Sequence, residues 1–268
     1  MLYNRIDFPQ GGSEVTTIQN DLKESVSVCV EVGRLMLSNG AETYRVEDTI
    51  YRIGMSLGIN DVSVFVVPTA IIVTASDQFD DEVTQLARVS DRETNLEMIS
   101  MINQLSRDLS KNPKSANEVR VMLYRMQLDV NEYKPLTSIF FSAMGTGAFV
   151  LLFDGPFISV PIAFVLGGIA QAVFEYVSQI TNVSFFAELI AASIVGLLAS
   201  LAVSLGLGVN RDVIILSSVM TLVPGVAITN GLRDLMAGHL LAGVGGLSKA
   251  AMTAAAIGIG IALILSVI

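Results

Sequence analysis

The chain has 268 residues, of which 52% are hydrophobic and 15% are charged, and its mean hydropathy is +0.62. Soluble globular proteins carry about 25% charged residues, so this composition excludes a single soluble globule. The charges are uneven, since residues 1–134 hold 33 of them and residues 135–268 hold 8. The net charge of −9 argues against nucleic acid as a partner, because phosphate groups are bound by clustered Lys and Arg.

The first half is predicted to be a cytoplasmic α+β domain, over residues 1–134. Its apolar periodicity predicts four helices, over residues 14–39, 42–57, about 92–109 and 116–129. Gly40 and Gly58 are the expected ends of the first two helices. Runs rich in β-branched residues predict three strands, over residues 62–67, 70–74 and, more weakly, 83–89. The expected order is two helices, three strands and two helices.

The residues of this half do not favour an enzyme. The only histidine of the chain, His239, lies in the second half, so neither a Ser-His-Asp triad nor a His/Cys zinc site is expected here. The single cysteine, Cys29, lies between valines and is predicted to be a buried, inert thiol. We therefore expect no catalytic residue, no metal and no cofactor.

Residues 135–268 are predicted to form an all-α membrane bundle of five transmembrane helices. A bilayer core about 30 Å thick needs roughly 20 helical residues, and charge-free segments of that length recur at 135–153, 155–174, 189–210, 213–232 and 250–268. Basic residues near the span ends place the first half in the cytoplasm and Ile268 outside. Five spans are a common size for one of two inverted transporter units, so a second unit is expected from a partner or a second copy.

The segment from Thr221 to Gly243 is the most informative part of this half. Pro224 and Gly225 predict a kinked or broken helix. Arg233 and Asp234 follow at the expected membrane boundary, and the run 235–248 is too short to span, so it is expected at the interface or as a re-entrant segment. Two interpretations stay open: a kinked helix that ends at an interfacial ion pair, or a broken helix that offers backbone groups to a substrate.

Chemistry assigns candidate roles to the polar residues. Arg233 is the candidate that binds a carboxylate, with the backbone at Pro224 and Gly225 and the side chains of Thr229 and Asn230 orienting the substrate. Carboxylates inside membrane spans are often proton-linked, and the candidates here are Glu175, Glu188 and Asp234. Glu175 and Glu188 also fit simple caps of span ends, and His239 fits an interfacial histidine.

Two strings carry a family resemblance. They are SNGAETYRVEDT, at residues 38–49, and LVPGVAITNGLRDLMAGHLLAG, at residues 222–243. With VFVVPTAI and LARVSDR between them, the chain resembles the threonine/serine exporter family over nearly its whole length. Within the first string the family motif residues are Gly40, Glu42, Arg45 and Glu47. The charges of this string fit either a charged helix face or a contact surface toward the membrane domain.

The resemblance implies amino-acid export driven by the proton motive force across the bacterial plasma membrane. A chain with five spans resembles the larger subunit of the split form of the family, which works with a small, separately encoded membrane subunit. Split members are also linked to succinate export, so a dicarboxylate stays an alternative substrate. A membrane-anchored sensor or scaffold is the alternative from another functional class.

Overall fold

The computed structural model describes residues 12–76, 81–90, 94–129, 135–181, 184–207 and 210–268. The chain forms two compact units, residues 1–131 with 233–243 and residues 132–232 with 244–268. The expected junction at residue 134 and the expected helix start at Arg92 lie outside the described residues.

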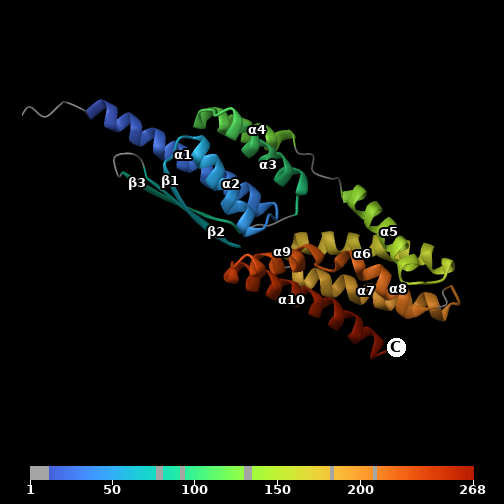
Figure 1. Ribbon diagram of the computed structural model, residues 1–268. Helices are drawn as coiled ribbons and strands as arrows, with labels where there is room; N and C mark the ends of the chain where they lie inside the picture. The colour runs from blue at the N-terminus through green and yellow to red at the C-terminus, as the bar shows by residue number, and fades with distance from the viewer. Residues whose placement is uncertain (1–11, 77–80, 91–93, 130–134, 182–183, 208–209) are drawn as a thin grey trace, which may run out of the picture. The chain divides into compact units, whose positions relative to one another are not determined.

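The first unit contains a three-stranded sheet and helices (Figure 1). Its elements are α1 (Gly12–Ser38), α2 (Thr43–Ser56), β1 (Asp61–Val67), β2 (Ala70–Ser76), β3 (Glu82–Arg88), α3 (Leu96–Lys111) and α4 (Ala116–Asp129). The predicted order of two helices, three strands and two helices is confirmed. Gly40 and Gly58 end the first two helices with φ angles of 88° and 82°, which residues with a Cβ rarely adopt.

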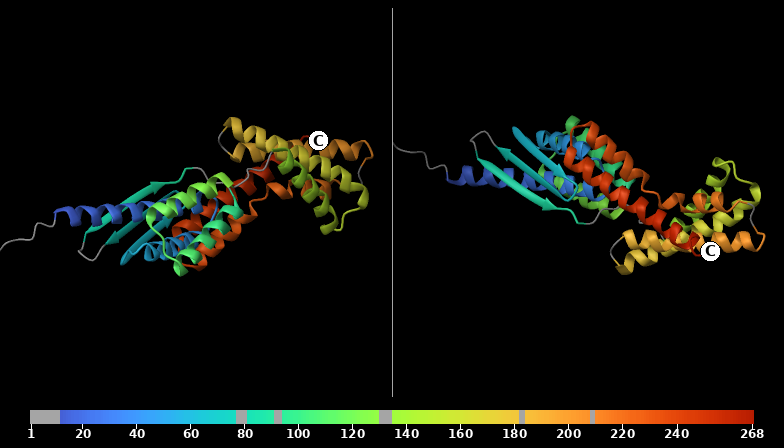
Figure 2. Two further views of the ribbon diagram at one scale, coloured as in Figure 1. Left: turned by 90° about the horizontal axis from the view of Figure 1, so that it is seen from above. Right: turned by 90° about the horizontal axis from the view of Figure 1, so that it is seen from below.

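The sheet is antiparallel in the order β1-β2-β3, with Val66 opposite Ile71 and Ile71 opposite Ala87. Alternate residues of β2 are buried, as expected for a sheet with one face in the core. Helix α1 packs along β2 and β3, which can be followed in Figure 2.

The core of the first unit is built around α1. Gly33 allows α1 to approach α2 closely, because a Cβ at this position would lie 2.6 Å from Cδ1 of Ile50. Cys29 is fully buried in the same core, which confirms the prediction of a buried thiol. Burial raises the pKa of the Cys29 thiol to about 12, so the thiol stays protonated and unreactive at neutral pH.

The second unit is helical. Its elements are α5 (Pro135–Leu152), the short η1 (Phe157–Ser159), α6 (Val160–Thr181), α7 (Ser184–Ser204), α8 (Arg211–Val219), the short η2 (Met220–Leu222) and most of α9 (Gly225–Met236) and α10 (Leu240–Leu265). Four of these segments are long and apolar enough to cross a membrane, and residues 211–236 make a fifth span if the bent pair of α8–η2 and α9 counts as one. The bend of 60° at Pro224 confirms the predicted break.

The structure corrects three expectations about the spans. Helix α7 ends at Ser204, so the third span is 185–204 rather than 189–210. The prediction of a separate interfacial or re-entrant segment over 235–248 is wrong, because α10 is continuous from Leu240 to Leu265. For the same reason the last span is 240–265 rather than 250–268. The sequence analysis placed a boundary at Lys249 because of its charge. The helix continues through this residue because the charged side chain is exposed.

Small residues allow close helix packing in this unit, as the sequence predicted. The hydroxyl of Thr146 on α5 donates to the carbonyl of Ala163 on α6 at 2.9 Å, and a Cβ at Gly167 would overlap the Thr146 side chain. On α10, a Cβ at Gly260 would lie 2.5 Å from the carbonyl oxygen of Leu189 on α7. Both positions therefore require glycine.

Candidate functional site

Six polar side chains of the first unit meet where segment 233–243 contacts the start of α2 and the end of β1. We call them the signature cluster: Glu42, Thr43, Glu47, Arg233, Asp234 and His239. All six belong to the same compact unit, although 191 residues separate Glu42 from Arg233. The cluster joins the two strings that the sequence analysis singled out.

An arginine–carboxylate bridge forms the first part of the cluster. Nη1 of Arg233 donates to Oε1 of Glu42 at 2.7 Å, and Nε of Arg45 lies 3.3 Å from Oε2 of the same carboxylate. The Glu42 side chain is 7% exposed, whereas that of Arg233 is 54% exposed. Two cations therefore share one buried carboxylate, and one of them keeps an accessible side.

The second part of the cluster is a helix cap supplied from a distant part of the chain. Glu42 occupies the N-cap position of α2, but its side chain makes no capping hydrogen bond. The backbone N–H and the hydroxyl of Thr43 both donate to Oδ1 of Asp234, at 3.1 and 2.7 Å. Asp234 thus satisfies an N–H that the helix leaves unpaired, and its charge is favourable at this end of the helix dipole.

The third part surrounds Glu47, one turn along α2. Its Oε1 accepts a hydrogen bond from the Val66 N–H at 3.1 Å and lies 3.7 Å from Nδ1 of His239. Burial raises the pKa of Glu47 above its ordinary value, and the nearby Asp234 charge adds to this effect. The Val66 N–H and His239 oppose the shift without cancelling it. His239 therefore lies beside the Glu47 carboxylate.

The other residues of the predicted substrate site belong to the second unit. Pro224 and Gly225 lie at the bend between η2 and α9. The hydroxyl of Thr229 donates to the Gly225 carbonyl within the same helix, and its side chain is exposed. Asn230, on the next position of α9, is partly buried. Arg233 meets a carboxylate of its own chain, Glu42, so its role in substrate binding stays a prediction.

The two predicted proton carriers in the spans differ in their surroundings. Glu175 on α6 is partly buried, and it accepts a hydrogen bond at 2.9 Å from Gln171, which also donates to Ser138. Glu188 on α7 is 7% exposed and hydrogen-bonded with Thr253 of α10, with Lys249 of the same helix near enough to interact electrostatically. Its Oε2 atom is buried and has no hydrogen-bond partner among the residues that the structure describes.

The comparison with protein families decides the identity of the chain. A family model described as "Putative threonine/serine exporter" matches residues 27–268. This chain belongs to the ThrE threonine/serine exporter family. No curated protein and no solved structure matches it. ThrE proteins are transporters and not enzymes, and the apolar helices of the second unit fit a membrane protein.

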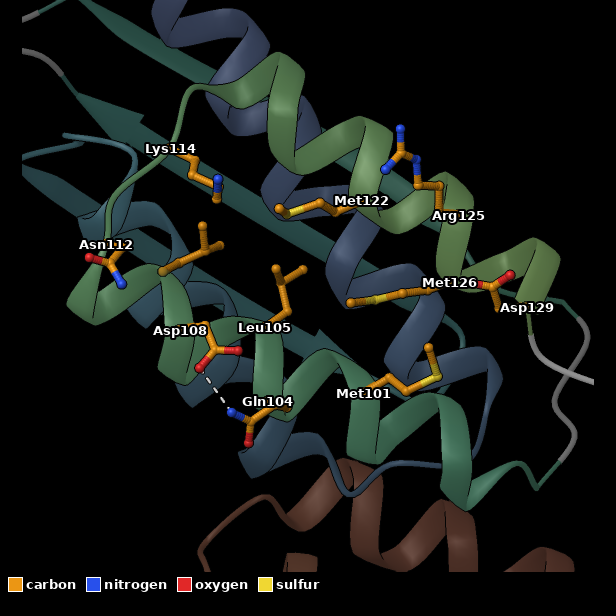
Figure 3. A pocket seen from close by; sticks show the side chains of 11 residues that line it. Met101, Gln104, Leu105, Asp108, Asn112, Lys114, Met122, Arg125, Met126 and Asp129 are labelled. Carbon is orange, nitrogen blue, oxygen red and sulfur yellow. Dashed lines mark hydrogen bonds between the residues drawn. The ribbon is translucent and has the colours of Figure 1, made fainter.

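The first unit of this ThrE chain also contains a cavity between α3 and α4, of about 480 Å³ (Figure 3). Met101, Leu105, Met122 and Met126 line its apolar part. The rim is polar and carries both signs of charge, with a Gln104–Asp108 hydrogen bond of 2.9 Å among its contacts. This chemistry suits an apolar group, and the cavity shares no residue with the signature cluster.

Sequence reasoning identified both ThrE strings but missed how they pair. Asp234 was considered as a proton carrier, and the structure places it as the cap of α2. His239 was considered interfacial, and the structure places it beside Glu47. The opposite charges of the two strings could have predicted this pairing. Glu42 and Glu47 in one string contact Arg233 and His239 in the other.

Proposed function

We propose that this ThrE chain is a subunit of a secondary exporter that couples efflux of threonine and serine to proton entry. It lies in the bacterial plasma membrane, with the N-terminal domain, residues 1–134, in the cytoplasm and the C-terminus outside. The exported solute carries a carboxylate, and the proton motive force drives its movement.

The observation that carries this proposal is the buried carboxylate of Glu188 on α7. A carboxylate inside a membrane-spanning helix is costly, and such residues commonly serve ion or proton pathways. Oε2 of Glu188 has no hydrogen-bond partner among the described residues, so it can take up a proton without breaking a hydrogen bond. The Glu188 side chain is also hydrogen-bonded with Thr253. We assign proton coupling to Glu188 rather than Glu175, because Glu188 is buried and its Oε2 has no partner among the described residues, whereas Glu175 is only partly buried.

Arg233 supports a carboxylate substrate. Its guanidinium already binds the Glu42 carboxylate, so the geometry suits a second carboxylate that replaces Glu42 during transport. The half-exposed side chain leaves room for this exchange. Asn230 and the backbone at Pro224 and Gly225 are the proposed groups that orient the substrate, and Thr229 contributes once its hydroxyl leaves the Gly225 carbonyl.

A second membrane subunit, or a second copy of the chain, completes the transporter. Many secondary transporters pair two units of inverted topology, and the described residues supply at most five spans. Co-purification of a small membrane protein with the tagged chain, or a dimer in detergent, supports this part. A monomer that transports alone contradicts it.

The experiment compares Glu188→Gln with Glu175→Gln in cells that lack the native exporter. Glutamine keeps the size and the hydrogen-bonding capacity of the side chain but cannot carry the proton. We expect Glu188→Gln to abolish export and Glu175→Gln to retain it, with both proteins inserted at wild-type levels. Full export by Glu188→Gln contradicts the proton assignment.

Substrate identity is tested in the same cells with labelled threonine, serine and succinate. The proposal predicts that the chain lowers intracellular threonine and serine and leaves succinate unchanged. Export of succinate alone identifies a dicarboxylate exporter instead. A chain that changes none of the three solutes fits the sensor or scaffold alternative.

A further inference from the structure

A further pocket, which is polar, lies between α2 and α3 in the first unit, and none of the residues of the predicted substrate site lines it. Its volume is about 520 Å³. One face of α2 contributes Tyr44, Arg45, Asp48 and Arg52, which follow the helical spacing of three and four residues. Helix α3 contributes Asn103 and Arg107. At the junction of the two helices, Thr49 donates to Oδ1 of Asn103 at 3.4 Å.

The charge of this pocket contrasts with that of the chain. Three guanidinium groups and one carboxylate line it, in a protein whose net charge is −9. Asp48 lies 3.0 Å from Nε of Arg52 and offsets part of that charge. Gln104 accepts two hydrogen bonds from Arg107, at 3.2 and 2.7 Å, and this fixes the orientation of the Arg107 guanidinium.

We propose that this pocket binds a small anion with several negatively charged oxygens, either a phosphate or a dicarboxylate. Guanidinium groups bind carboxylate and phosphate through paired hydrogen bonds, and Arg is the preferred residue for such recognition. Arg45, Arg52 and Arg107 converge on the pocket from two helices, and the Tyr44 hydroxyl and Asn103 amide add neutral donors. None of the residues that line this pocket is a proposed substrate-binding residue, and the proposal does not depend on which solute is exported.

The pocket is connected to the signature cluster through one residue. Arg45 lines the pocket and also lies 3.3 Å from Glu42, the carboxylate that binds Arg233. An anion in the pocket competes with Glu42 for Arg45. Anion binding therefore changes the interactions that hold Arg233, and by thermodynamic linkage the charge of Glu42 changes the affinity for the anion.

The test is calorimetric titration of the full-length protein in neutral detergent. Inorganic phosphate and succinate are the two probes, each added at constant ionic strength against a chloride control. We expect saturable binding of at least one probe, and the tighter probe identifies the anion class. In the double variant Arg52→Gln/Arg107→Gln, we expect affinity to fall about tenfold or more, because two charged contacts are lost. Arg125→Gln, an exposed arginine on α4, is the matched control and should bind as the wild type does.

Two results overturn the proposal: no saturable binding of either probe above the chloride control, or equal affinity in the wild type and the double variant. The link to the signature cluster has its own test, Glu42→Gln, which removes the competing charge and should tighten binding severalfold. An unchanged affinity in a folded Glu42→Gln protein contradicts the link. Since binding is measured without transport, failure here leaves the proposed function standing.

Discussion

Arg233 and Glu42 bring the two strings that carry the family resemblance into direct contact, through a hydrogen bond of 2.7 Å between residues 191 positions apart. The carboxylate of this pair is buried, and the guanidinium is half exposed. A pair of this kind is stable enough to hold segment 233–243 against α2. The guanidinium keeps an accessible side, which the proposed exchange of Glu42 for a ligand carboxylate requires.

A double-mutant cycle measures this pair. Arg233→Gln should lower the free energy of unfolding by only about 1 kcal/mol, because half-exposed ion pairs are screened by solvent. Glu42→Gln should cost more, about 2 kcal/mol, since it leaves both Arg233 and Arg45 without their shared buried carboxylate. The double variant should be less destabilised than the sum of the two. Strict additivity in chemical denaturation contradicts a direct interaction.

Asp234 is predicted to stabilise α2 from outside the helix. Asp234→Ala removes the acceptor for two Thr43 donors and should cost about 1–2 kcal/mol, the range found for helix caps. Asp234→Asn keeps an acceptor oxygen and should cost less. Thr43→Ser, which retains the hydroxyl, is the control for changes at the other partner. Equal stability of Asp234→Ala and the wild type in thermal unfolding rules out the cap.

The raised pKa of Glu47 predicts how the free energy of unfolding depends on pH. Its pKa is raised in the folded protein, so the folded state binds this proton more tightly than the unfolded chain does. The contribution of Glu47 is fully present below its unfolded pKa of about 4.3 and is lost as pH rises through the higher folded pKa. Glu47→Gln removes this slope, so its stability relative to the wild type should increase between about pH 4 and the folded pKa. A pH-independent difference contradicts the raised pKa.

Glu118 provides a control, because its pKa is lowered where that of Glu47 is raised. Its Oε2 accepts from the N–H and the hydroxyl of Ser115, at 3.0 and 2.9 Å, and these bonds lower its pKa. Its contribution is present above the unfolded pKa and is lost as pH falls through the lowered one. Glu118→Gln should therefore become relatively less stable as pH rises, the reverse of Glu47→Gln. Slopes of the same sign in both variants refute this account of one or both carboxylates.

Two glycines of α10, two residues apart, test the packing of the second unit. Gly260→Ala places a methyl group against the Leu189 carbonyl and should cost about 1–3 kcal/mol, the usual range for overpacking. A Cβ at Gly258 has no neighbour within 4 Å among the described residues, so Gly258→Ala should be tolerated. Size-exclusion chromatography and thermal unfolding in detergent compare them. Equal behaviour of the two variants contradicts the α7–α10 contact.

Local sequence patterns predicted much of the fold. Runs rich in β-branched residues predicted the strands at 62–67 and 70–74, and charge-free runs predicted the spans. Gly40 and Gly58 predicted helix ends and Pro224 predicted a kinked or broken helix, since the backbone is unusually free at glycine and restricted at proline. These features depend on neighbours in the sequence, and a single sequence shows them directly.

Long-range pairing could not be predicted in the same way. Nothing in the local pattern specifies that Asp234 caps a helix that begins at Thr43, because the two are neighbours only after folding. The continuity of α10 was missed for a different reason. The charge at Lys249 interrupts the apolar segment in the sequence, so a boundary between two segments was predicted there. In the structure the helix continues through Lys249, because its single charged side chain is exposed.

The proposed export of threonine by use of the proton gradient is tested most directly by labelled efflux. Cells lacking the native exporter are preloaded with labelled threonine, with and without the chain, and efflux is followed before and after an uncoupler. We predict that the chain lowers steady-state intracellular threonine severalfold and that the uncoupler abolishes this difference. An intracellular threonine level that is the same with and without the chain, or a difference that survives the uncoupler, would contradict the account.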